Sequence, residues 1–204
     1  MKLLNKSMKS KENLIKISKC DKINFMNYYE VIYMDIVKKF VKEWAIPIIC
    51  AIILAFIINK FIFFNVSVPT ESMYPTIKPG DKIFVLRNYR PSSLKRGDIL
   101  VFHSKEANED LIKRLVGLPN EKVEIKSDGT VFVNDIQLEE SYVKYKSDKV
   151  GTFMVPEGCY LFLGDNRANS VDSRYWSNPY IPYDEIMGEA KFIIKPFNRF
   201  GALK

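Results

Sequence analysis

An apolar run from Trp44 to Phe64, WAIPIICAIILAFIINKFIFF, constrains the fold of this chain more than any other feature. As a helix, these roughly 21 residues are long enough to cross the hydrocarbon core of a bilayer. Asn59 and Lys60 interrupt the run near one end, where a lysine can extend its ammonium to the headgroups. A cleavable signal peptide is the alternative, but 43 residues precede the run and no small-residue cleavage site follows it. We therefore expect an uncleaved, single-span anchor over residues 44–64.

The charge distribution indicates how such an anchor is oriented. The formal charge is +7, and residues 1–43 hold ten lysines and five acidic residues, so most of the excess precedes the apolar run. This asymmetry predicts a cytoplasmic N-terminus, an extracytoplasmic remainder and no nucleic-acid partner. Residues 1–43 are a basic segment, either an amphipathic helix on the anionic inner leaflet or a loosely ordered tail.

Residues 65–204 have the pattern of a mainly β domain. Short β-favouring runs alternate with turn residues, and no sustained helical periodicity follows the anchor. The runs predicted as strands are Lys82–Leu86, Ile99–Phe102, Leu111–Val116, Lys122–Ile125, Thr130–Val133, Gly158–Leu163 and Ile186–Ile194. The tripeptide Ser127-Asp128-Gly129 predicts a hairpin between two of them. This region contains a single cysteine, Cys159, so it must be held together by its core rather than by an internal disulfide.

The stretch Val66–Ile77, VSVPTESMYPTI, follows the anchor directly. Its two prolines fix φ and remove backbone donors, which predicts that Ser72 lies in a stiff, non-helical bend. As a nucleophile, Ser72 would need a base, and the candidates are Lys113 and the single histidine, His103. His103 ends a predicted strand and enters a polar run, so we expect it to be a solvated bystander. An ordinary turn serine is the alternative reading of Ser72.

Lys113 lies inside an otherwise apolar predicted strand, next to Arg114. Strand alternation places these two cations on opposite faces, so a single solvent-facing side would explain one of them but not both. A lysine with an ordinary pKa of about 10.4 is almost entirely charged at pH 7. Burial that lowers this pKa to about 8 leaves roughly 10% neutral amine, which can act as a general base.

Two other stretches have patterns that predict defined local structure. Arg96–Phe102 reads as a turn leading into a buried strand, and we interpret it as scaffold. Gly164–Arg174 is dense in hydrogen-bonding side chains directly after an apolar strand, with alternating Asp and Arg. That alternation predicts an internally braced loop that could hold Ser170 toward a neighbouring group.

Together these stretches resemble the bacterial type I signal peptidases (leader peptidases), the membrane-anchored Ser/Lys proteases of peptidase family S26, in their single-anchor form. The resemblance covers roughly residues 44–195. It rests on four motifs in the family's order, at residues 69–77, 96–102, 112–121 and 164–174, with Gly188-Glu189-Ala190 as a weaker fifth. It implies that Ser72 is the acylating nucleophile and Lys113 the neutral general base.

The resemblance also implies roles for other residues. The Thr70 hydroxyl and the Ser72 backbone N–H would form the oxyanion hole. Ser170 would hydrogen-bond the lysine, and Asp172 with Arg174 would brace its loop. An extended substrate with small residues at P3 and P1 would lie along Val66, Val68, Pro69, Leu111 and Ile112. The implied fold is mostly antiparallel β, with a small β insertion at about residues 121–156.

The partners implied by the resemblance are signal peptides of exported preproteins, the lipid bilayer and, functionally, the secretion machinery. No metal or organic cofactor is expected. Two residues depart from the family pattern: Leu111 stands where many relatives carry tyrosine, and Glu71 where many carry glycine, at the lip of the expected cleft.

Two other functions compete with this interpretation. A self-cleaving Ser/Lys repressor is disfavoured by the anchor and by the lack of a DNA-binding helical domain. An inactive, membrane-anchored β binding module is disfavoured because Ser72, Lys113 and Ser170 are present together.

Overall fold

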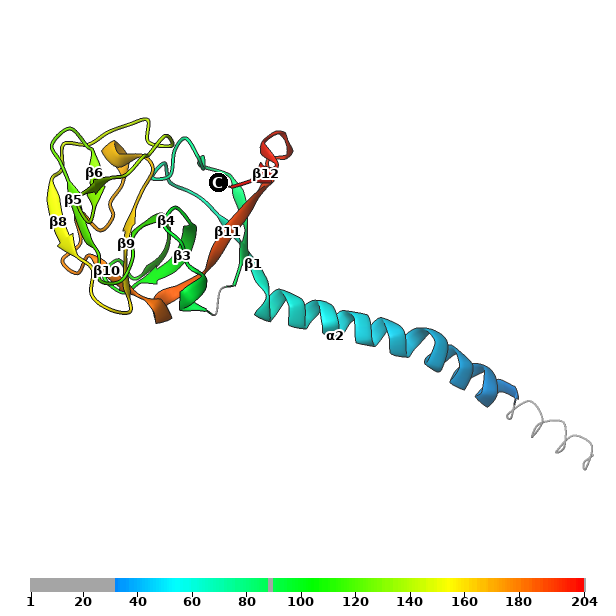
Figure 1. Ribbon diagram of the computed structural model, residues 1–204. Helices are drawn as coiled ribbons and strands as arrows, with labels where there is room; N and C mark the ends of the chain where they lie inside the picture. The colour runs from blue at the N-terminus through cyan, green and yellow to red at the C-terminus, as the bar shows by residue number, and fades with distance from the viewer. Residues whose placement is uncertain (1–31, 88–89, 204) are drawn as a thin grey trace, which may run out of the picture. The chain divides into compact units, whose positions relative to one another are not determined.

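The computed structural model of this chain describes residues 32–87 and 90–203 (Figure 1). Most of the predicted basic segment therefore lies outside the described residues. The chain divides into two compact units, residues 1–56 and residues 57–204. Each unit is described by itself below.

A single helix runs from Ile32 to Phe61, and within the described residues it is the one helix long and apolar enough to cross a membrane. It contains a π-helical turn, η1 (Val41–Ala45), followed by α2 (Ile46–Phe61), which has no buried residue. The wider turn comes just before Pro47, whose missing N–H interrupts the α-helical hydrogen bonds. The helix ends three residues before the predicted limit of Phe64, because the next residues pair with a neighbouring strand.

The larger of two sheets has eight strands in the order β1-β2-β11-β3-β4-β9-β10, with β12 paired to β11 (Figure 1). All of its pairings are antiparallel. The strands are β1 (Phe63–Ser67), β2 (Lys82–Leu86), β3 (Ile99–Ser104), β4 (Glu109–Gly117), β9 (Cys159–Leu163), β10 (Tyr180–Pro182), β11 (Ile186–Lys195) and β12 (Gly201–Ala202).

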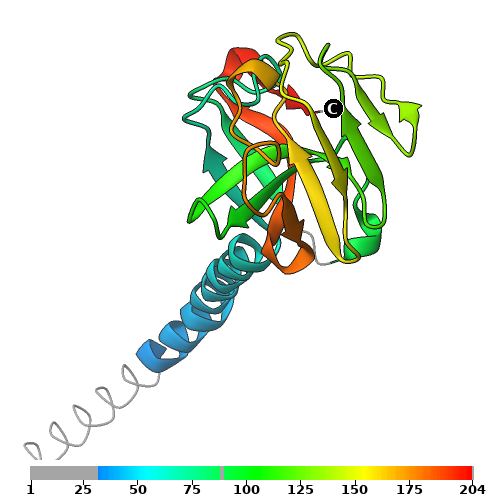
Figure 2. The same ribbon diagram turned by 90° about the vertical axis from the view of Figure 1, so that its left-hand side faces the viewer.

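A smaller antiparallel sheet has four strands in the order β7-β6-β5-β8 (Figure 2). They are β5 (Lys122–Ile125), β6 (Val131–Val133), β7 (Ile136–Gln137) and β8 (Gly151–Met154). The predicted hairpin joins β5 to β6, and Gly129 adopts the positive φ of +80° that its turn requires. All four strands lie within residues 121–156, the range expected for a β insertion.

Short 3₁₀ helices connect several strands: η2 (Pro91–Ser93), η3 (Arg167–Asn169), η4 (Tyr183–Glu185) and η5 (Phe197–Arg199). Every run predicted as a strand is a strand in the structure, to within a few residues at its ends, and the mainly β fold class is confirmed. The sequence did not reveal β1, β7, β8, β10 or β12. These are short or adjoin Gly, Pro or the apolar helix, so pairing rather than composition decides them.

Three buried apolar clusters form the core, and one lies directly beneath the loop between β1 and β2. This loop places Met73 and Ile77, both fully buried, against Ile83 and Val101. Burying a side chain of this size stabilises a fold by about 1.5–3 kcal/mol. Met73 and Ile77 therefore anchor the loop in the core, and Ser72 directly precedes the first of these anchors.

Candidate active site

Ser72 lies in the bend between β1 and β2, as predicted. The bend is closed by backbone hydrogen bonds from Tyr74 N–H to Glu71 O at 3.0 Å and from Ile77 N–H to Met73 O at 2.9 Å. Ser72 itself is buried, with 6% of its surface exposed. The bend holds the nucleophile candidate in a defined position, because residues on its C-terminal side are anchored in the core.

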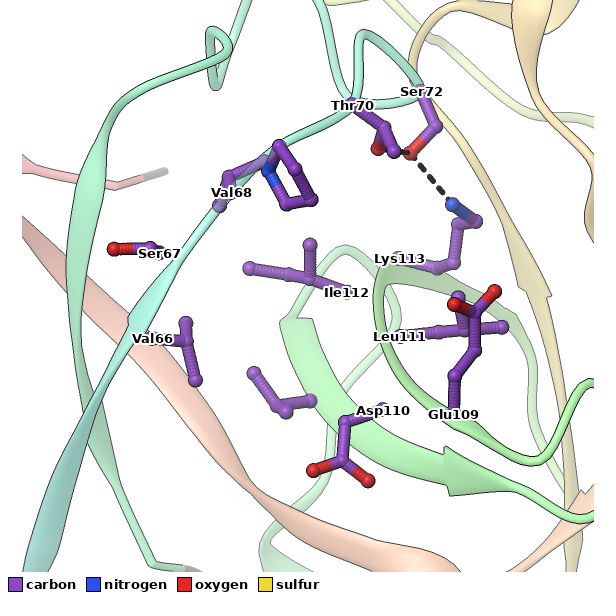
Figure 3. Close-up of a pocket in the computed structure, with 12 residues that line it drawn as sticks. Val66, Ser67, Val68, Thr70, Ser72, Glu109, Asp110, Leu111, Ile112 and Lys113 are labelled. Atoms are coloured by element: carbon purple, nitrogen blue, oxygen red, sulfur yellow. Dashed lines mark hydrogen bonds between the residues drawn. The ribbon is translucent and has the colours of Figure 1, made fainter.

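Lys113 comes from β4 and points toward Ser72 (Figure 3). The Lys113 ammonium donates a hydrogen bond to Ser72 Oγ over 2.6 Å, and the Thr70 hydroxyl oxygen lies 3.3 Å from the same Oγ. Lys113 is only 3% exposed. Residues 41 positions apart in the sequence therefore meet as a buried serine–lysine pair.

The surroundings of Lys113 raise the fraction of its amine that is neutral. Burial lowers the pKa of Lys113 from 10.5 to about 8, and the carboxylates of Asp172 and Glu109 offset part of that lowering. At a pKa of about 8, roughly 10% of the amine is neutral at pH 7. The amine can therefore accept a proton from the hydroxyl that it contacts.

Arg114, on the opposite face of β4, is just as buried but is fully paired. Its guanidinium donates to Asp165 at 2.8 and 2.7 Å and to Gly97 O at 2.7 Å, and it lies 3.9 Å from the centroid of the Tyr142 ring. Both faces of this part of β4 are thus covered by other residues. Neither Lys113 nor Arg114 is therefore explained by a solvent-facing side of the strand. Arg114 is held by a carboxylate, whereas Lys113 donates to a hydroxyl.

The loop Gly164–Arg174 is braced by the predicted pair. Arg174 donates to both oxygens of Asp172, at 2.8 and 2.9 Å, and Asp172 also accepts the backbone N–H of Gly164 at 2.9 Å. All three residues are buried. The loop is joined to the bend that carries Ser72, because Asn166 N–H donates to Ser72 O at 3.1 Å.

Ser170 is buried in this loop, but the hydrogen bond to Lys113 that the resemblance implied is not formed. Its Oγ has no hydrogen-bond partner among the described residues. Ser170 is instead packed tightly against Gly164. A Cβ placed on Gly164 would lie 2.2 Å from Ser170 Oγ and 2.5 Å from Ser72 O, so only glycine fits there.

A cleft of about 270 Å³ begins at the serine–lysine pair and extends between β1 and β4 (Figure 3). The substrate-binding residues expected from the resemblance all line it: Val66, Val68, Pro69, Leu111 and Ile112. Sequence reasoning missed four other lining residues, Ser67, Val101, Glu109 and Asp110. Strand alternation could have identified Glu109, which shares a face of β4 with Leu111 and Lys113.

His103 lies away from the pair. His103 on β3 is paired with Asp110 on β4. Lys113, three positions after Asp110 on β4, is paired with Leu100. Its Nδ1 lies 2.9 Å from Asp110 Oδ1, and the ring is 45% exposed. The structure therefore brings Ser72 together with Lys113 and not with the histidine.

A buried serine–lysine pair at the end of a cleft, on a mainly antiparallel β fold, indicates a serine hydrolase. Over residues 41–195 the chain matches the family described as signal peptidase, peptidase S26. The chain belongs to this family. With its apolar helix, this indicates a membrane-anchored peptidase.

Two relatives with similar sequences agree with this assignment. Signal peptidase IB of Staphylococcus aureus (strain COL) is 38% identical, covering 80% of this chain and 94% of the relative. Signal peptidase I T of Bacillus subtilis (strain 168) is 37% identical, covering 79% of this chain and 89% of the relative. A crystal structure of a signal peptidase I from Enterococcus faecalis V583 matches at 32% identity with a TM-score of 0.42, covering 47% of this chain and 95% of that one.

Proposed function

We propose that this protein removes N-terminal signal peptides from exported preproteins, with Ser72 as nucleophile and Lys113 as general base. The observation that carries the proposal is the 2.6 Å contact between a buried Lys113 Nζ and Ser72 Oγ. Signal peptidase is the name of the relatives and of the family. The substrates are therefore polypeptides that carry signal peptides.

The reaction proceeds through an acyl-enzyme. The neutral amine of Lys113 takes the Ser72 hydroxyl proton as Oγ attacks the scissile carbonyl carbon. The Thr70 hydroxyl and the Ser72 backbone N–H donate to the oxyanion. When the C–N bond breaks, the Lys113 ammonium returns the proton to the leaving amine. Water then hydrolyses the ester, with Lys113 again accepting a proton and returning it to Ser72 Oγ.

The shape of the cleft supports a preference for small residues before the cut. Val66, Val68, Leu111 and Ile112 line the cleft with branched apolar side chains. An extended peptide between β1 and β4 alternates its side chains, so those of P1 and P3 point to the same side. We expect these walls to accept alanine and to disfavour large side chains.

The proposal is tested by incubating the detergent-solubilised protein with a preprotein and locating the cut by mass spectrometry. We expect cleavage after a P1 alanine, and a loss of about 100-fold or more in kcat/KM when that residue is replaced by phenylalanine. Ser72→Ala is the control for contaminating peptidases. Cleavage by wild type that is equally fast after phenylalanine would contradict the proposed specificity.

The dependence on pH separates a lysine base from a histidine base. With the Lys113 pKa at about 8, the neutral fraction and kcat/KM should rise about tenfold per pH unit below pH 8 and level off above it. An imidazole base would level off near its usual pKa of about 6.5. His103→Gln should retain most of the activity and the same alkaline limb. A profile that levels off below pH 7, or a thousandfold loss in folded His103→Gln, would exclude the lysine mechanism.

For topology we propose a single pass, with the N-terminus in the cytoplasm and residues after Val66 outside, beside the secretion machinery that delivers preproteins. This rests on the net +5 of residues 1–43. Reporter fusions after Lys39 should be active only in the cytoplasm, and fusions after Val66 only outside. A cytoplasmic signal from fusions at the C-terminus would overturn the orientation and the role in export.

A further inference from the structure

A second hollow borders the nucleophile, and none of its lining residues lines the cleft described above. Its volume is about 390 Å³. It is lined by Glu71, Tyr74, Tyr145, Asn166, Ala168 and Asn169, which we call the Glu71 groove. These residues come from the Ser72 bend, the braced loop and the segment that follows β7. The proposed mechanism uses none of their side chains.

The Glu71 groove is attached directly to the peptide units around Ser72. Asn166 donates its backbone N–H to Ser72 O at 3.1 Å and its side-chain amide to Glu71 O at 3.2 Å. The far wall is held by Ala168 N–H donating to Tyr145 O at 3.2 Å. The rings of Tyr74 and Tyr145 lie 5.7 Å apart. Hydrogen bonds therefore hold the walls of the groove in a fixed position relative to Ser72.

Glu71 is the only acidic residue that lines this groove. It is exposed, and its carboxylate accepts a hydrogen bond from the neutral Asn169 amide at 3.4 Å. No salt bridge to Glu71 is formed within the described part of the chain. The flanking cation Lys78 lies over the Tyr74 ring, 5.6 Å from its centroid. The groove thus combines two aromatic rings with an unneutralised carboxylate.

We propose that the Glu71 groove binds the first residues of the mature protein, and that Glu71 favours a cationic side chain there and disfavours an acidic one. This inference rests on the proposed function. If the signal peptide occupies the cleft along Val66–Pro69, the chain after the scissile bond must leave past Ser72. An extended chain advances about 3.3 Å per residue, so its second and third residues lie roughly 7–10 Å beyond the bond. We place these two residues in the Glu71 groove, because Glu71 directly precedes Ser72 and Asn166, on the facing loop, donates to Ser72 O.

The test uses preproteins that differ only in the second or third residue after the cut, which is Lys, Gln or Glu. For wild type we expect kcat/KM for the Lys substrate to exceed that for the Glu substrate by about fivefold at low salt. The ratio should fall as ionic strength rises, because exposed charges are screened. Glu71→Gln should bring the ratio close to one, and Glu71→Lys should reverse it.

Glu109→Gln is the matched control, since it also removes one negative charge, but from the β4 wall of the cleft rather than from the Glu71 groove. It should keep the wild-type ratio between Lys and Glu substrates, whatever its overall rate. A ratio that is the same in wild type, Glu71→Gln and Glu71→Lys would overturn the inference while leaving Ser72-dependent cleavage intact. Absence of Ser72-dependent cleavage of every substrate would instead overturn the proposed function, and the inference with it.

Discussion

Replacing Lys113 by arginine is expected to abolish cleavage as completely as Ser72→Ala does, with a loss of about 10³-fold or more in kcat/KM. Arginine keeps the positive charge but cannot supply a neutral amine at any pH used for the assay. Lys113→Ala should lose as much, because the Ser72 proton then has no acceptor. The measurement is the single-turnover rate of acylation with one preprotein, compared across the three variants.

The structure also sets the controls for this experiment. Ser170→Ala should cost less than any change at the dyad, because both members of the 2.6 Å contact remain and Ser170 Oγ bonds neither of them. Melting temperatures close to wild type would show that the Lys113 variants remain folded. Near wild-type cleavage by folded Lys113→Arg would contradict the general-base role and would show that Lys113 contributes only its positive charge.

The largest effect on stability is expected for Asp165→Asn. Asp165 is fully buried and accepts hydrogen bonds from Arg114 at 2.8 and 2.7 Å and from the Thr76 hydroxyl at 2.5 Å. The amide removes the negative charge that the buried guanidinium contacts, and breaking a buried ion pair in this way typically costs about 3–5 kcal/mol. For a domain of this size, that loss corresponds to a fall in melting temperature of about 10 °C. The melting temperature is measured by thermal unfolding of the full chain in detergent.

Glu124→Gln makes the same chemical change in a partly exposed group of three charges and serves as the control. Glu124 lies 3.3 Å from Lys122 and 3.4 Å from Lys126 on the small sheet, where solvent screens all three charges. Its melting temperature should stay close to wild type. Equal shifts for Asp165→Asn and Glu124→Gln would show that Arg114 is not stabilised by its buried carboxylate.

Local patterns in the sequence determined much of this protein. The apolar run predicted a helix, and the structure ends that helix at Phe61, one residue after Lys60. Ser127-Asp128-Gly129 predicted a hairpin and forms one between β5 and β6. The order of four motifs pointed to the family that the comparisons show. Features of this kind are set within a few neighbouring residues, by hydrophobic length, turn geometry and alternation, and can therefore be read without coordinates.

Other features depend on segments that are distant in the sequence. The missed strands exist only because a partner strand pairs with them, and Phe63 and Phe64 leave the apolar run to pair with β2. The sequence could say what burial would do to Lys113, but not that the fold buries it. Its low pKa arises from desolvation by packed neighbours, while Arg114 next to it is held by Asp165.

The position of Ser170 was likewise decided by tertiary packing. The resemblance implied a bond to Lys113, but the Oγ lies against Gly164 and has no hydrogen-bond partner among the described residues. The Glu71 groove needs residues from three separated segments, which no single motif contains. The sequence by itself thus determined which groups are available and which local shapes carry them. Only the tertiary structure decided which groups touch and which are shielded from water, because desolvation and hydrogen bonding depend on atoms brought together from distant parts of the chain.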